Sequence, residues 1–261
     1  MEFSSAELDF LCEQLGVDEL PYPFDVHSQG ATMNERAALR TQVLGGLFER
    51  GLVDGAGRPE PRLEDAFAVL RSAELSLDAV HIAEPAGTVS SAMAATLGGQ
   101  GLLAVQEAGG LRLREVPTDG LASAIVELLP GLRRGTEKSV TVELRELMSG
   151  HGVDFMQRRP SPDGAERTGA DEDRKTLARL HAQPRQRGGQ LGANARSDGG
   201  PRTRGPVLSW FDTESGCYFT QASKGQDGRD WITIAPVDAP TLRNRLNEML
   251  SGAVRSREGL G

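Results

Sequence analysis

The sequence contains few of the residues, and none of the motifs, on which enzymes commonly depend. Two cysteines in 261 residues exclude a disulfide framework and indicate reduced thiols in a cytosol. No G-x-S-x-G elbow, phosphate-binding loop, H-E-x-x-H or C-x-x-C motif occurs. The four histidines stand far apart in unrelated contexts. We therefore expect no catalytic site, no metal site and no cofactor.

Long apolar runs and an excess of basic residues are also missing. No stretch approaches the roughly 18 apolar residues that span a bilayer. The first residues lack the basic start and apolar run of a signal peptide. The formal net charge of −8 opposes general binding to phosphate backbones. These absences predict a cytoplasmic protein that binds neither membrane nor nucleic acid.

The residues that are present fit a folded domain. Hydrophobic residues make up 38% and charged residues 25% of the chain, as in soluble globular proteins. Aromatic residues are scarce at 5%, whereas glycines number 32. The core must therefore consist mainly of leucine, valine and alanine, with many turns made by glycine.

The first half predicts helices followed by a meander of strands. Capping boxes at Ser4-x-x-Glu7 and Thr32-x-x-Glu35 begin two helices, and a third carries Leu63–Leu70. Gly109-Gly110 indicates a tight hairpin. Strands are expected at 75–82, 88–96, 102–106 and 111–116.

The second half repeats this order of elements. Strands are expected at 207–212, 216–222 and 231–235, before a closing helix. A Pro-x-Asp corner follows the strands in each half, at Pro117 and at Pro236, where Thr118 or Asp119 and then Asp238 can cap the next helix. The pattern predicts an α/β fold of the α+β type: a mixed, largely antiparallel central sheet with helical bundles and two quasi-twofold halves. We expect one domain over 1–252, with half-repeats 1–135 and 136–252, and a disordered tail over 253–261.

The segment 157–205 differs in composition and is expected to be a partly flexible insert. It contains 11 Lys and Arg against 6 Asp and Glu. A helix over 171–182, a weak strand over 190–195 and a mobile loop over 197–205 are predicted. The arginines between 185 and 204 could touch an acidic partner or phosphates, but no aromatics are interleaved to stack bases, so a solvated loop is favoured.

Two groups of apolar residues on strands could form either a core or a docking face. Val89, Met93 and Leu97 share one face of a strand by their period of two. The second group is aromatic: Trp210, Phe211, Tyr218 and Phe219. For each residue taken singly, the core is favoured. The nearby match to G-x-G-x-x-A at 99–104 leads into a strand, so it indicates a hairpin and not a dinucleotide site.

Several motifs, in order along nearly the whole chain, resemble the EspG family of type VII secretion chaperones. The N-terminal ones are Leu11-Cys12-Glu13-x-Leu15-Gly16, Leu20-Pro21-Tyr22-Pro23-Phe24-Asp25-Val26 and Gly30-Ala31-Thr32-x-x-Glu35-Arg36. The C-terminal ones are Ser209-Trp210-x-Asp212-Thr213 and Trp231-Ile232-Thr233-Ile234-Ala235-Pro236.

This resemblance implies a cytosolic, non-enzymatic chaperone of actinobacteria. It would bind a PE–PPE heterodimer through the apolar tip of the PPE protein, keep the pair soluble and direct it to one secretion system. When free, the chain would be a monomer or weak dimer. The family's contacts lie on the sheet, on the loop after the second strand and on the C-terminal helices. The candidate partner-binding residues are therefore Val89, Met93, Leu97, Gly98, Gly99, Gln100, Trp210, Phe211, Tyr218 and Phe219.

Two alternatives remain open. One is a non-catalytic α/β adaptor or scaffold for another protein. The other is an enzyme whose site is not apparent from the sequence, built around Cys217 or His81.

Overall fold

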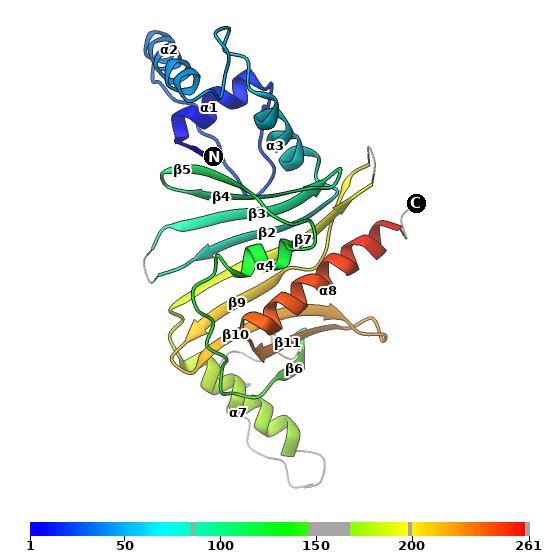
Figure 1. Ribbon diagram of the computed structural model, residues 1–261. Helices are drawn as coiled ribbons and strands as arrows, with labels where there is room; N and C mark the ends of the chain where they lie inside the picture. Colours follow the sequence, from blue (N-terminus) through cyan, green and yellow to red (C-terminus); the bar gives the residue numbers. More distant parts are fainter. Residues whose placement is uncertain (85–86, 146–167, 198–199, 259–261) are drawn as a thin grey trace.

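The computed structural model describes residues 1–84, 87–145, 168–197 and 200–258. Within these ranges, eleven strands form one sheet in the order β1-β5-β4-β3-β2-β7-β9-β10-β11-β6, with β8 beside β7 (Figure 1). The strands are β1 Glu2–Phe3, β2 Leu75–Ile82, β3 Val89–Leu97, β4 Gln100–Glu107, β5 Gly110–Glu115, β6 Val140–Glu143, β7 Arg187–Arg196, β8 Arg202–Arg204, β9 Leu208–Thr213, β10 Gly216–Lys224 and β11 Asp230–Pro236. The helices are α1 Ser5–Gln14, α2 Met33–Glu49, α3 Pro61–Ser72, α4 Leu121–Val126, α7 Thr168–Ala182 and α8 Ala239–Glu258.

The sheet is arranged symmetrically about its central pair, β2 and β7. From β2 the strands β3, β4 and β5 follow outward, and from β7 the strands β9, β10 and β11 do the same. Every pairing between these strands is antiparallel. The mixed fold with a largely antiparallel sheet is therefore confirmed.

The two Pro-x-Asp corners behave differently. Asp238 Oδ1 accepts a hydrogen bond of 2.9 Å from the backbone N–H of Thr241 and so caps α8. The prediction of a cap from Thr118 or Asp119 is wrong, because Gly120 occupies the N-cap of α4 and no side chain caps it.

Each face of the sheet carries its own helices. The short α4 and the long α8 cross one face, while α1, α2 and α3 lie at the N-terminal end of the molecule and α7 at the other end (Figure 1). On the α4/α8 face, alanine and leucine side chains of β2 and β7 pack with Ile125, Leu242 and Leu246. On the opposite face, α3 packs on β3 and β4 and α1 packs on β5, in one cluster that includes Leu11 and Phe67.

The segment 157–205 contributes a central strand. β7 pairs with β2 over eight residues and with β9 over five, where a weak strand was expected. β8 lies within the predicted mobile loop and pairs with β7. Residues 146–167, which include the start of this segment, lie outside the described residues.

The prediction of a disordered tail over 253–261 is wrong for residues 253–258. Helix α8 continues to Glu258, and Ala253 is 1% exposed because it packs into the core on the α4/α8 face. Across the described ranges, no helix has both the length and the apolar character required to cross a membrane.

Candidate partner-binding surface

Five of the ten candidate residues lie in the core. Trp210 and Phe219 pack under α4 and α8 on one face of the sheet. Phe211 and Tyr218 stack on the other face, with ring centroids 5.7 Å apart, beside Leu180 of α7. Met93 is 1% exposed in the cluster beneath α1 and α3. These five side chains fill the core and leave a partner almost no surface to contact.

The other five candidates lie at opposite ends of β3. Val89 begins the strand and is 52% exposed, whereas the half-buried Leu97 and the exposed Gly98, Gly99 and Gln100 form its turn into β4. Eight residues separate these ends, a distance of roughly 26 Å at the usual rise along a strand. The structure therefore does not bring the two groups together.

Val89 belongs to a patch that we call the open sheet surface, defined by Tyr22, Ile82, Val89, Gln190 and Val207. Ile82 is the direct cross-strand partner of Val89. The exposed Gln190 lies opposite Val80, two residues before Ile82 on the same face. Tyr22, Gln190 and Val207 line one cavity of about 510 Å³. Among the described residues, four of the seven exposed large hydrophobic side chains lie here, so apolar exposure is concentrated on this surface.

The surface is open because the helices on this face contact other strands. Alternate residues of β2 point to opposite faces. Leu77 and Ala79 meet the core under α4 and α8, so Asp78, Val80 and Ile82 point away from it. On that opposite face α1 contacts β5, α3 contacts β3 and β4, and α7 contacts β6. The middle of the sheet remains between them.

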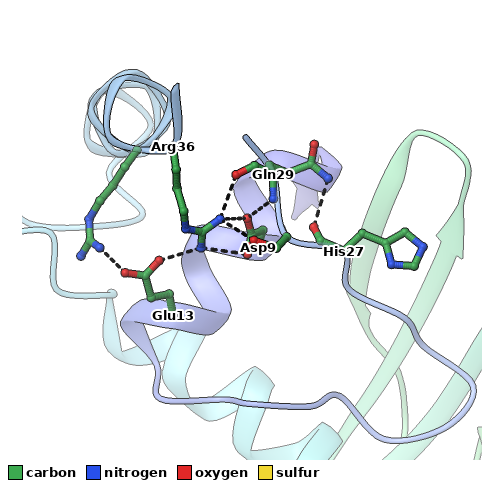
Figure 2. A network of polar contacts seen from close by, with 7 residues as sticks. Asp9, Glu13, His27, Gln29 and Arg36 are labelled. Carbon is green, nitrogen blue, oxygen red and sulfur yellow. Dashed lines mark hydrogen bonds and ion pairs between the residues drawn. The ribbon is translucent and has the colours of Figure 1, made fainter. Parts of the chain in front are cut away.

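A polar network fixes the loop between α1 and α2, which borders this surface. Arg36 of α2 donates to Asp9 of α1 at 2.6 Å and to the carbonyl of Gln29 at 2.9 Å, and it also reaches Glu13 (Figure 2). Asp9 in turn accepts the backbone N–H of Gln29 at 2.7 Å. Burial raises the pKa of the Asp9 carboxyl, but the hydrogen bonds from Arg36 and Gln29 outweigh burial and hold the pKa below its ordinary value.

The same loop is also tied to the sheet by residues that precede Gln29. The backbone N–H of Asp25 donates to Gln106 of β4 at 2.9 Å. Tyr22 lies with its ring centroid 5.0 Å from the guanidinium carbon of Arg204. The loop is thus a fixed border of the open sheet surface, and Val26 of this loop lines a second cavity of about 510 Å³ together with Val89 and Gln106.

Sequence reasoning missed Tyr22, Ile82, Gln190 and Val207 as surface residues. Ile82 could have been found, because an antiparallel pairing of the predicted strands places it beside Val89 on one face. The other three carry no local signal. Their exposure depends on which faces the helices leave uncovered.

The two residues considered for catalysis are poorly suited to it. Burial and the neighbouring Asp212 carboxylate raise the pKa of the Cys217 thiol to about 12, so the nucleophilic thiolate is disfavoured. His81 is 4% exposed, and its Nδ1 has no hydrogen-bond partner among the described residues. Within the described ranges, no group of three His, Cys, Asp or Glu side chains is placed to hold a metal ion.

The comparisons with known proteins agree with this architecture. A solved structure of the Mycobacterium tuberculosis type VII secretion system chaperone EspG5, in complex with a PE25–PPE41 dimer, resembles the chain with a TM-score of 0.69. The two are 14% identical, over 96% of this chain and 95% of that one. No curated protein matches the sequence. The family model described as the EspG family matches residues 4–248. The chain therefore belongs to the EspG family.

Proposed function

We propose that this chain is a cytosolic, non-enzymatic chaperone of a type VII secretion system, and that it binds a PE–PPE heterodimer through the PPE protein. The observation that carries the proposal is the open sheet surface in a chain of the EspG family. Apolar side chains exposed at the middle of a sheet are costly to leave in water and are suited to covering the apolar end of a partner. The complex recorded for EspG5 supports this choice of partner.

Because the aromatic candidates are buried, the proposed contacts are limited to the candidates that are exposed. Val89 is exposed on the open sheet surface, and Gly98, Gly99 and Gln100 are exposed at the β3–β4 turn. The turn borders a cavity of about 910 Å³ that Arg62 and Asp65 of α3 also line. We assign the main contact to the open sheet surface, and the turn to its periphery.

Co-expression tests the function directly. When this chain is produced together with the PE–PPE pair encoded nearest to its gene, we expect a soluble 1:1:1 complex on size-exclusion chromatography with light scattering. The pair produced without the chain should be insoluble or aggregated, because its apolar surface is then uncovered. Failure to form a complex with this pair and with more distant pairs would leave the adaptor alternative in its place.

Val89→Glu should weaken binding of the pair at least tenfold in a calorimetric titration. A carboxylate on the open sheet surface would have to lose its hydration shell when the partner covers it. The fold should tolerate the change, because Val89 is 52% exposed. The matched control is Met33→Glu, which places the same charge on an apolar residue 82% exposed at the start of α2. Equal affinities of the two variants would contradict the assignment of the surface.

A further inference from the structure

Three side chains form a polar cluster at the centre of the sheet, beside the open sheet surface. The Asp78 carboxylate on β2 is 1% exposed. It accepts hydrogen bonds from Arg204 Nη1 at 2.6 Å and Nη2 at 2.8 Å, and from Asn194 Nδ2 at 2.8 Å. The guanidinium therefore holds the carboxylate by two parallel bonds, the strongest geometry available to this pair.

Gly192 of β7 makes room for this pair. It lies directly opposite Asp78 across the strands. A Cβ atom at position 192 would lie 2.8 Å from Arg204 Cζ and 2.9 Å from Asp78 Oδ1. A side chain there would therefore displace the guanidinium from the carboxylate. The glycine indicates that the centre of this sheet is shaped to hold an arginine across it.

A second arginine at the cluster has no full counter-charge there. Arg202 Nη2 lies 3.5 Å from Asp78 Oδ2 and 3.4 Å from Ser76 Oγ, and the side chain is 24% exposed. The negative charge of Asp78 is already balanced by Arg204. Asp78, Arg202 and Arg204 together therefore carry a net charge of +1. Burial lowers the pKa of Arg202; the Asp78 carboxylate acts in the opposite direction, but Arg204 and Arg196 add to the lowering.

The cluster forms one wall of the cavity of about 510 Å³ that opens on the open sheet surface. The other lining residues include the apolar Val207 and the Tyr22 ring, against which Arg204 packs. A cationic wall beside apolar walls fits a short side chain that ends in a carboxylate. Arg202 and Arg204 therefore lie against the sheet, whereas the sequence favoured a solvated loop.

We propose that this cavity receives an acidic side chain of the protein partner, whose carboxylate pairs with Arg202. The proposal rests on the proposed function and adds to it the chemistry by which the partner is recognised. The chain carries a net charge of −8, so a cationic cavity on an apolar surface distinguishes partners that present an acid at that point from those that do not. The apolar contacts of the open sheet surface supply affinity, and the ion pair fixes the position of the partner on that surface.

The test uses the full chain, the PE–PPE heterodimer encoded nearest to its gene and calorimetric titrations at 50 and 300 mM NaCl. Arg202→Gln removes the charge but keeps a hydrogen-bond donor, on a shorter side chain. We expect it to weaken binding about tenfold or more and to flatten the dependence of affinity on salt. Arg202→Lys should recover part of the affinity, because it restores the charge without the guanidinium. The matched control is Arg58→Gln, since Arg58 is 80% exposed and pairs with Asp54 four residues away.

The outcomes separate the two proposals. A wild-type chain that forms no complex overturns the proposed function, and this inference with it. A wild-type complex whose affinity does not change with salt, or an Arg202→Gln variant that binds as the wild type does, overturns the inference alone. The salt dependence of the wild-type chain decides the matter even if a variant folds poorly. As a positive outcome, Arg202→Glu should lose binding and should regain it when one acidic residue of the PPE protein is changed to lysine.

Discussion

Trp210→Ala should lower the free energy of unfolding by about 3–5 kcal/mol. The indole is 2% exposed on β9 and belongs to the core under α4 and α8. Truncation would remove its burial energy and leave a cavity that the antiparallel strands on either side, β7 and β10, prevent from collapsing. Urea unfolding followed by circular dichroism measures the change, with an unaltered slope expected because the surface exposed on unfolding is nearly the same.

Tyr22→Ala is the matched control for this prediction. It also removes a large aromatic ring, but from a residue that is 50% exposed on the open sheet surface. Its cost to stability should be within about 1 kcal/mol, whereas its effect on partner binding should exceed that of Trp210→Ala in any population that remains folded. A Trp210→Ala variant with wild-type stability and no binding would instead mean that Trp210 contacts the partner.

The elements that could be predicted from the sequence are those whose cause is local. In both predicted capping boxes the reciprocal hydrogen bonds form, between Ser4 and Glu7 and between Thr32 and Glu35. The hairpin at Gly109-Gly110 depends equally on its own residues, since Gly110 adopts φ of 130°. Each of these signals lies within four residues of its effect, so no tertiary information is needed to find it.

The sequence predicts the central strand β7 only weakly, because the contacts that stabilise it come from residues distant in the chain. Its sequence contains Gly188, Gly189 and Gly192, and glycine is unfavourable in isolated strands. In the sheet these glycines are required by close approach: a Cβ at Gly189 would lie 2.5 Å from the carbonyl oxygen of Val80 on β2. The neighbour that makes the glycine necessary is more than 100 residues away in the chain.

The candidate surface was partly mispredicted for the same reason. Alternation correctly places Trp210 and Phe219 on one face and Phe211 and Tyr218 on the other. It does not say that α8 covers the first pair and α7 the second. Val89 differs from Met93 on the same face because α3 packs on the cluster that contains Met93, while Val89 lies at the strand's open end. Exposure is thus decided by the helices.

Asp78→Ala should lower the free energy of unfolding by about 3 kcal/mol. The substitution removes a carboxylate that satisfies Arg204 and Asn194 at the centre of the sheet. Asn194 is 2% exposed and cannot turn to water, and Arg202 and Arg204 would face each other without the intervening negative charge. Urea unfolding measures the loss. Raising the salt concentration should recover part of it, since the remaining repulsion is between partly exposed cations.

A double-mutant cycle separates the pair from the packing around it. Asp78→Ala combined with Arg204→Ala should cost less than the sum of the two single changes, because the second substitution removes the cation that the first leaves unpaired. Exact additivity would mean that the observed two-point hydrogen bond contributes nothing to stability, and that Gly192 is needed for another reason. A strong coupling would instead mean that the fold itself holds Arg204 in place, which leaves the neighbouring Arg202 as the arginine available for a partner's carboxylate.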